Sequence, residues 1–228
     1  YSSSYGTLAN ASGLASMAFG AGANASETGA IAHGVNSIAS GANSSTFGTA
    51  STATEEDAIA FGYSAAASGV DAIAIGTSSV ASETNSTAIG TEAEATAENS
   101  IAIGDSAKTS AANATAVGTL AVASQLSSSA YGTEAAATGE RSMAFGASAA
   151  ANKQNTTAMG TSARATGAYA SSYGTNANAD AVAAMAFGSG AKATATTAIS
   201  FGTNSSASGA NAVVMGTDAV ASAEDATA

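Results

Sequence analysis

Bulky side chains recur along the chain with a period of fourteen residues, and each of them directly precedes a glycine. The glycines run from Gly6 to Gly216 at this spacing, sixteen times and without an insertion. We number each unit from its glycine as position 0, so that the bulky residue is at −1 and the residue at −2 is Ala in most units. A period held this long predicts a solenoid of about sixteen equivalent coils.

The residues between the glycines favour strands over helices. Fourteen residues equal two heptads, but a coiled coil needs Leu or Ile at two positions of each heptad, flanked by charged residues. The chain has few leucines, a glycine in every unit, and clusters of Asn, Ser and Thr, which interrupt helices. Residues 100–113 contain two short alternating segments bounded by turn residues, which predict one coil of a two-sheet β-roll. The glycines are assigned to turns, among them Gly62, Gly76, Gly90, Gly104 and Gly118.

Charged residues indicate which positions of the coil face water. Every acidic and basic residue lies between +1 and +9, and none lies at +3 or +5. Positions +2 and +4 accept charged residues such as Glu92 and Lys108. We therefore expect a strand that shows +2 and +4 to water and buries the Ala-rich positions +3 and +5. A coil of this length is narrow, and stacked alanines suit its interior.

The bulky column at −1 allows two orientations. If the small −2 residue points inward, −1 and −3 point outward, and sixteen coils at about 4.8 Å each display an apolar stripe roughly 75 Å long. A monomer rarely exposes such a patch, so this orientation predicts an obligate oligomer with identical stripes on a symmetry axis. In the alternative, −1 and −3 pack inward against the alanines. We favour the outward orientation because Ser and Thr occur at −3 and because His33 occupies −1.

Composition excludes several classes of protein. Of the 228 residues 46% are hydrophobic, mostly alanine, and only 9% are charged. The lack of cysteine and the single histidine exclude a disulfide scaffold or zinc module, and the lack of proline excludes collagen. No apolar run is long enough for a membrane-spanning helix. The net charge of −11 excludes nucleic acid as a partner.

Two units carry a resemblance to a known family. Asn85-Ser-Thr-Ala-Ile-Gly90 and Asn99-Ser-Ile-Ala-Ile-Gly104 resemble the Asn-Ser-Val-Ala-Ile-Gly repeats of the YadA-like head domains of trimeric autotransporter adhesins. The resemblance covers essentially the whole chain and implies an all-β, left-handed parallel β-roll that forms a homotrimer. It also implies a single head domain over residues 1–228, a fragment of a longer passenger on the surface of a Gram-negative bacterium. A C-terminal barrel that this chain does not include would anchor the passenger in the outer membrane.

In such a homotrimer the −1 column is the expected interface. The column comprises Phe19, His33, Phe47, Phe61, Ile75, Ile89, Ile103, Val117, Tyr131, Phe145, Met159, Tyr173, Phe187, Phe201 and Met215.

The resemblance implies a non-enzymatic adhesin head. Three identical faces of repeated coils would add weak contacts into avidity. The expected partners are extracellular matrix proteins such as collagen, fibronectin or laminin, other bacteria, and abiotic surfaces. Two alternatives stay open. One is a ligand-free spacer within a fibre, and the other is an ice-binding face formed by the threonine column at +1, which includes Thr77, Thr91, Thr119 and Thr133.

No residues form a catalytic, metal-binding or cofactor-binding pattern, so we expect neither enzyme activity nor a cofactor. His33 is interpreted as an ordinary substitution in the −1 column, and the acidic segment 55–57 as a solvated turn. Exposed apolar residues are the adhesive candidates, although isolated ones are normal on protein surfaces. They are Leu120 and Val122, which are expected to form a small patch with Leu126 in the following turn, and Ile38 and Val80 on the same sheet.

Overall fold

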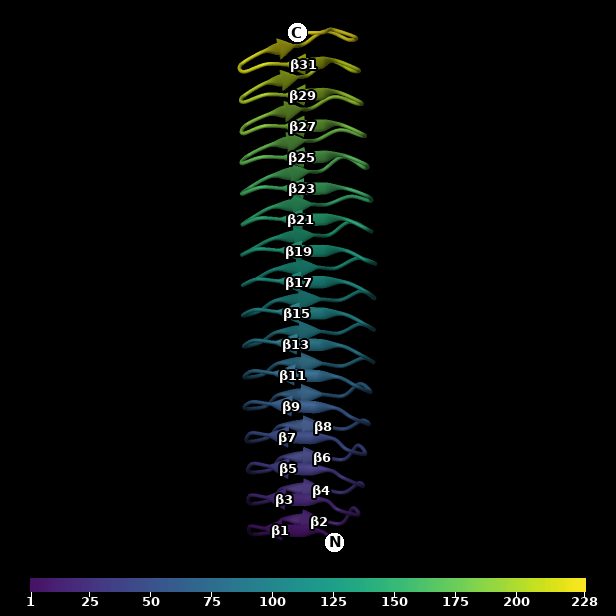
Figure 1. Cartoon of the computed structure of the whole chain (residues 1–228), viewed down its shortest axis with the longest axis vertical. Helices are drawn as coiled ribbons and strands as arrows, with labels where there is room; N and C mark the ends of the chain where they lie inside the picture. The colour runs from purple at the N-terminus through teal and green to yellow at the C-terminus, as the bar shows by residue number, and fades with distance from the viewer. The chain divides into compact units, whose positions relative to one another are not determined.

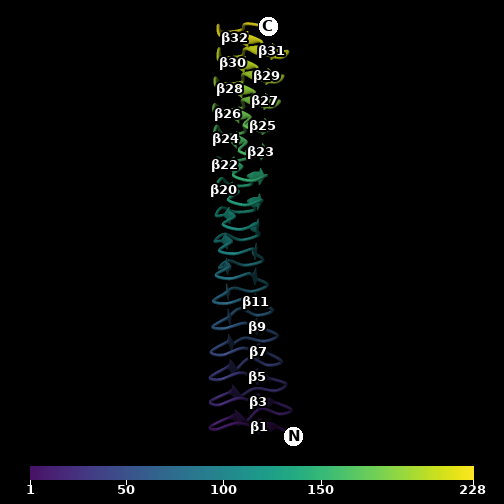
Figure 2. The ribbon, with the colours of Figure 1, turned by 90° about the vertical axis from the view of Figure 1, so that its left-hand side faces the viewer.

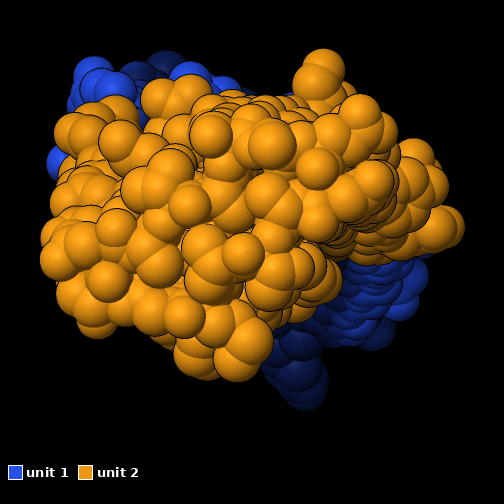
Figure 3. All heavy atoms as spheres, turned by 90° about the horizontal axis from the view of Figure 1, so that it is seen from above, with its two compact units in different colours: residues 1–113 blue, residues 114–228 orange.

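The computed structural model describes all of residues 1–228, and every regular element in it is a β-strand. It contains no helix that is long and apolar enough to cross a membrane. The chain forms two compact units, unit 1 (residues 1–113) and unit 2 (residues 114–228), which Figure 3 colours separately. Within each unit, strands of two and three residues alternate along the chain and stack coil upon coil (Figure 1).

In unit 1 the odd-numbered strands form one parallel sheet and the even-numbered strands form another. The odd sheet contains β1 (Ser3–Tyr5), β3 (Met17–Phe19), β5 (Ile31–His33), β7 (Ser45–Phe47), β9 (Ile59–Phe61), β11 (Ile73–Ile75), β13 (Thr87–Ile89) and β15 (Ile101–Ile103). The even sheet contains β2 (Asn10–Ala11), β4 (Asn24–Ala25), β6 (Ile38–Ala39), β8 (Thr52–Ala53), β10 (Ala66–Ala67), β12 (Val80–Ala81), β14 (Glu94–Ala95) and β16 (Lys108–Thr109).

Unit 2 repeats this arrangement. Its odd sheet contains β17 (Thr115–Val117), β19 (Ser129–Tyr131), β21 (Met143–Phe145), β23 (Thr157–Met159), β25 (Ser171–Tyr173), β27 (Met185–Phe187), β29 (Ile199–Phe201) and β31 (Val213–Met215). Its even sheet contains β18 (Val122–Ala123), β20 (Ala136–Ala137), β22 (Ala150–Ala151), β24 (Arg164–Ala165), β26 (Asn178–Ala179), β28 (Lys192–Ala193), β30 (Ser206–Ala207) and β32 (Val220–Ala221).

Neighbouring strands pair in parallel with an offset of fourteen residues, so that equal positions of successive coils stack. In unit 1, Ala74 pairs with Ala88 of the next coil, and in unit 2, Ala144 pairs with Ala158. Figure 2 shows the odd and even strands of unit 2 on opposite sides of the coil. The predicted all-β parallel roll of fourteen-residue coils is confirmed. Its left-handedness, its homotrimeric assembly and the extent of a single head domain stay predictions.

Each coil consists of two similar halves of seven residues. Each half has a turn, a buried small residue and a strand. In the coil of residues 90–103 the turns place a positive φ at Glu92 (55°) and again seven residues later at Asn99 (54°). Four positions point inward in each coil, namely +3, +5, −4 and −2, and the alanines there are almost all fully buried. The largest fully buried side chain is that of Val214, which shows how narrow the interior is.

The sequence did not identify −4 as an inward position, because serine is common there. The structure explains the serine by a local hydrogen bond. Ser86 Oγ donates to the carbonyl oxygen of Glu83 at 2.6 Å and accepts from the Glu83 amide at 3.2 Å. Ser128 makes the same pair of bonds with Gln125 at 2.6 and 3.2 Å. A hydroxyl that bonds to the adjacent turn can be buried at little cost.

The residue at +2 lies in a turn and not on the strand to which the sequence analysis assigned it. Glu134 and Leu120, both at +2, have φ values of 57°. The even strands begin at +4, as β14 does with Glu94. Backbone bonds between coils hold the turn in place. The Glu134 amide, for example, donates to the Thr119 carbonyl of the preceding coil at 2.8 Å. The conformation of the turn is therefore determined by backbone hydrogen bonds between stacked coils, and not by the side chain at +2.

Glycine at position 0 is required both by its conformation and by the neighbouring coil. Gly132 has a φ of 130°, in the region that residues with a Cβ rarely adopt. A Cβ at this residue would lie 2.6 Å from the Gly146 carbonyl oxygen of the next coil. The glycines assigned to turns from the sequence, Gly62 to Gly118, lie at this bend with φ between 131° and 142°.

Candidate self-association face and adhesive surface

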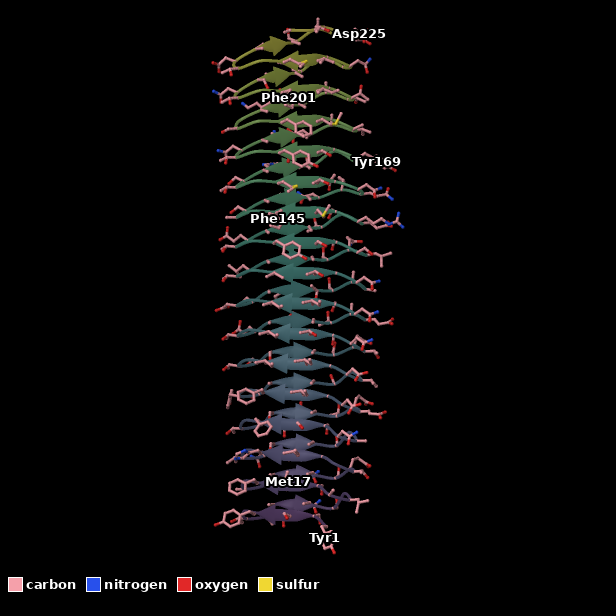
Figure 4. All side chains as sticks on the ribbon, in the orientation of Figure 1. Tyr1, Met17, Phe145, Tyr169, Phe201 and Asp225 are labelled. Atoms are coloured by element: carbon pink, nitrogen blue, oxygen red, sulfur yellow. The ribbon has the colours of Figure 1, made fainter.

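The outward side chains at −3 and −1 of the odd strands form a surface that we call the apolar face. On β9, Ala60 is buried, whereas Ile59 and Phe61 are exposed on either side of it. Phe61 is 54% exposed, and Phe145 in unit 2 is 55% exposed. In Figure 4 the rings of Phe145 and Phe201 are seen over the strands of unit 2. The −1 column is therefore on the outside of the coil, and the inward alternative is wrong because the −2 side chains fill the interior.

Aromatic rings of successive coils contact one another along this face. In unit 1 the ring centroids of Tyr5 and Phe19 lie 5.1 Å apart and those of Phe47 and Phe61 lie 5.8 Å apart. In unit 2 the Tyr173 and Phe187 rings are stacked at 4.6 Å with an interplanar angle of 6°. Pairs at such distances contribute about 0.5–1.5 kcal/mol beyond the burial of their area. The stacked rings hold the column in ordered positions on the surface.

The apolar face carries no acidic residue, lysine or arginine, because every such residue lies on the even sheet or in the segments outside the strands. The only ion pair between coils illustrates this. Lys108 Nζ lies 3.0 Å from Glu94 Oε1, between β16 and β14. Both side chains are substantially exposed. The two outer surfaces thus differ in chemistry: the odd sheet is largely apolar and carries no acidic residue, lysine or arginine, whereas the even sheet carries charged side chains.

His33 is the only titratable nitrogen on the apolar face. Its ring lies edge-on to Phe19 at 5.1 Å and to Phe47 at 5.5 Å. These three residues, with Tyr5, Met17, Ile31 and the smaller side chains beside them, line an open cavity of about 550 Å³ on the odd sheet of unit 1. No group of three or more His, Asp or Glu side chains that could hold a metal ion occurs within the chain.

The structure separates the three apolar residues that were expected to form one patch. Val122 is on β18, while Leu120 and Leu126 are in the two turns at opposite ends of that strand. Ile38 on β6 and Val80 on β12 face outward from the even sheet of unit 1, as expected. All five side chains reach the surface, but Leu120 and Leu126 do not lie together.

Two exposed tyrosines were not singled out from the sequence. Tyr63 is 59% exposed at +1, and Tyr169 is 56% exposed at +9. Both are in turns, and Figure 4 shows Tyr169 at the edge of the ribbon. Their positions in the fourteen-residue unit, away from the four inward positions, would have been enough to identify them as exposed.

The threonine column at +1 is also in a turn. Thr77 and Thr91 in unit 1, and Thr119 and Thr133 in unit 2, follow directly after the position 0 glycine. The ice-binding face considered from the sequence would therefore consist of turn residues and not of a flat sheet.

Among solved structures, the chain is similar to the crystal structure of the collagen-binding domain of the Yersinia adhesin YadA. The two share 27% sequence identity over 65% of this chain and 68% of that chain, with a TM-score of 0.39. No curated protein matches the sequence.

The sequence also matches the family described as the YadA head domain repeat. Overlapping matches together cover residues 11–93, 95–149, 151–177, 179–205 and 207–228, which is nearly the whole chain. They follow the same fourteen-residue coils that the structure shows. The chain therefore belongs to the family of YadA head domain repeats, and this membership supports an adhesin-type function.

Proposed function

We propose that this chain is a non-enzymatic head segment of a trimeric bacterial surface adhesin. The observation that carries the proposal is the run of YadA head repeats over nearly the entire chain. The segment would be displayed at the cell surface as part of a longer fibre. Its role is attachment to extracellular matrix proteins, other bacteria or abiotic surfaces.

The apolar face supports self-association. Each unit exposes a continuous series of Phe, Tyr, Ile and Met side chains on its odd sheet, and such an area is normally covered by a partner. A chain of net charge −11 repels its own copies everywhere except at an uncharged surface. The apolar face is that surface, so the partner it fits is a second copy of this chain. The number three follows from the family and is part of the proposal.

Once the apolar face is covered, the even sheet and the turns are left to contact a ligand. The outward apolar residues there are the candidates, including the half-buried Val80 and Val122 on strands and the exposed Leu126 in a turn. Each contact is small and repeated in three copies. Weak contacts presented several times on one assembly raise the overall affinity without a deep binding site.

A second candidate function is that of a spacer, which positions another binding domain away from the cell. One observation favours it. Strands follow one another at the same spacing through both units, and no loop is inserted between them. Binding sites on rigid scaffolds are usually carried by loops.

Adhesion assays distinguish the two functions. We expect the isolated chain to bind at least one of four immobilised surfaces: collagen, fibronectin, laminin or bare plastic. Replacing Ile38, Val80 and Val122 together by Thr keeps β-branched side chains on the strands and removes apolar contact area. The apparent affinity for the surface should fall by about tenfold, because each of the three copies loses a contact and the losses multiply.

A matched control changes the same column of the even sheet at alanines. Ala66→Ser, Ala136→Ser and Ala150→Ser add hydroxyls without removing large apolar groups, and we expect binding to stay within about twofold of the native chain. If the native chain binds none of the four surfaces, the spacer function is correct and the adhesive proposal is wrong.

A further inference from the structure

Three coils carry a tyrosine on the apolar face, and all three have the same surroundings. In each, the tyrosine at −1 is preceded by a serine at −3, and the next coil carries Met-Ala-Phe at the same positions. We call these the tyrosine coils. They are Ser3–Tyr5 followed by Met17–Phe19, Ser129–Tyr131 followed by Met143–Phe145, and Ser171–Tyr173 followed by Met185–Phe187. Only one other coil, that of Ser45, has serine at −3, and it carries Phe47.

Each tyrosine ring lies against the phenylalanine ring of the following coil. The centroids are 5.1 Å apart for Tyr5, 5.6 Å for Tyr131 and 4.6 Å for Tyr173. These contacts fix the rings, so that the hydroxyls are presented at the outer surface. Tyr5 is 71% exposed and Tyr131 is 38% exposed. Tyr173 is half-buried. The three tyrosine hydroxyls thus lie on a face whose other −1 side chains, apart from His33, are apolar.

The tyrosine and serine hydroxyls of one coil cannot satisfy each other within the chain. Residues at −3 and −1 are on the same face of a strand, and their side chains project side by side, about 6.6 Å apart. A buried tyrosine hydroxyl needs a hydrogen-bond partner, since burial without one costs free energy. When the apolar face is covered, that partner must come from the covering molecule.

Rotational symmetry supplies such a partner. Around an axis of three copies the contacts are heterologous, so that one edge of a face meets the other edge of the neighbouring face. The −1 column of one copy then runs beside the −3 column of the next. When copies are level, Tyr131 of one copy lies beside Ser129 of the next, and Tyr173 beside Ser171.

We propose that the tyrosine coils fix the register of the assembled copies, through hydrogen bonds from each tyrosine hydroxyl to the serine of the same coil in the neighbouring copy. The inference rests on the trimer of the proposed function. The repeated backbone by itself does not determine the register of the copies. Because every coil has the same backbone, copies displaced by one coil, about 4.8 Å, would still fit together apart from their side chains. Polar groups buried in an apolar interface select one register in other repetitive assemblies.

The Met-Ala-Phe coil makes displacement costly. If one copy in a closed ring slides by one coil, its −1 column is one coil out of register with the −3 column of one neighbour. Its −3 column is one coil out of register, in the opposite sense, with the −1 column of the other neighbour. At one interface Tyr131 of one copy then faces Thr115 of the adjacent copy, whose hydroxyl can accept its hydrogen bond. At the other interface Tyr131 of another copy faces Met143, which offers only a weakly accepting thioether. Tyr173 faces Thr157 and Met185 in the same way, so every one-coil displacement leaves hydroxyls without a good partner.

A larger displacement fails for a different reason. Sliding by three coils brings Tyr131 beside Ser171, because the two tyrosine coils of unit 2 are three coils apart. The same movement brings Tyr173 beside Val213, which has no polar side-chain group. Only the level arrangement satisfies both tyrosines of unit 2.

Cysteine cross-linking tests the register, because the chain has no cysteine of its own. Thr87→Cys with Ile89→Cys places a pair in one coil that joins only level copies. Thr87→Cys with Ile103→Cys places a pair one coil apart that joins only displaced copies, since a disulfide requires Cα atoms within about 7 Å. Both pairs are outside the tyrosine coils. Covalent trimers of the level pair, and covalent dimers of the offset pair, which meets at only one interface of a displaced ring, are measured on non-reducing gels after mild oxidation.

We expect the level pair to give covalent trimers and the offset pair to give few covalent dimers. Combining the offset pair with Tyr5→Phe, Tyr131→Phe and Tyr173→Phe should increase the offset product by about fivefold or more, the change expected for one lost hydrogen bond. Ser129→Ala with Ser171→Ala should act in the same direction. Tyr63→Phe with Tyr169→Phe, the same chemical change in turns, should leave the product unchanged.

Sedimentation of every variant separates the possible failures. A variant that remains trimeric and gives no more offset product than the turn control overturns the register inference and leaves the trimer intact. A native chain that sediments as a monomer overturns the proposed trimer, and the register inference with it.

Discussion

In each unit the odd and even sheets bury the same kind of residue but present different outer faces. On β11 of the odd sheet, Ala74 is inside and Ile73 and Ile75 are outside. On β14 of the even sheet, Ala95 is inside and Glu94 is outside. The small residues that fill the interior therefore explain why the chain folds into coils. They do not explain how copies of the chain would associate. In the proposed assembly, association is decided by the outward positions, where the odd sheet carries rings, aliphatic groups and some hydroxyls but no acidic residue, lysine or arginine, and the even sheet carries charged residues.

The inner and outer faces should tolerate substitution very differently, and Ala74→Leu tests this most severely. Ala74 is fully buried between neighbouring coils, so three more carbon atoms have no room. We expect the free energy of unfolding to fall by about 3 kcal/mol or more, measured by denaturant unfolding. Ile73→Leu is the control, because it places the same side chain on the adjacent outward residue.

For Ile73→Leu we expect a change of less than about 1 kcal/mol. Equal losses for the two variants would mean that the alternation between inner and outer positions does not govern stability.

Removing the hydroxyl of the inward serine at −4 should lower the free energy of unfolding more than removing that of an outward serine of the same coil. Both losses should be smaller than that of Ala74→Leu. Ser86→Ala removes the bond from its Oγ to the Glu83 carbonyl and the one accepted from the Glu83 amide. Other coils carry alanine at −4, for example Ala58 and Ala72, so the fold is kept. We expect a loss of about 1 kcal/mol in the free energy of unfolding.

The matched change at +6, Ser82→Ala, should cost no more than about 0.5 kcal/mol, because that side chain is partly exposed. A larger loss at Ser82 than at Ser86 would contradict the assignment of −4 to the interior.

Much of the coil could be predicted from the sequence, because its period is uninterrupted and its inward positions are almost all alanine. The −4 position was missed for a physical reason. A serine beside a turn looks solvent-exposed, and only the bond to the carbonyl three residues earlier explains its burial, as in Ser44 with Gly41. The sequence pattern does not report such a bond.

The turns were harder to predict than the strands. Arg141 and Leu120 adopt positive φ values of 52° and 57°, which residues other than glycine, asparagine and aspartate rarely do. Their side chains give no indication of this conformation. The bond from the Arg141 amide to the Leu126 carbonyl of the preceding coil shows why it is stable, since stacking imposes it on whichever residue occurs there. For the same reason the expected patch of Leu120 with Leu126 could not be judged until the turns were placed.

The most direct test of the central claim, that the apolar face joins copies of the chain, is sedimentation equilibrium of the native chain beside two double variants. The native chain should sediment at three times its mass of 21.3 kDa. Ile75→Glu with Ile89→Glu on the odd sheet should shift it to monomers, because unpaired charges in an apolar contact are costly. Ala66→Glu with Val80→Glu on the even sheet should leave it trimeric. A native monomer, or dissociation by the even-sheet pair and not by the odd-sheet pair, would contradict the account.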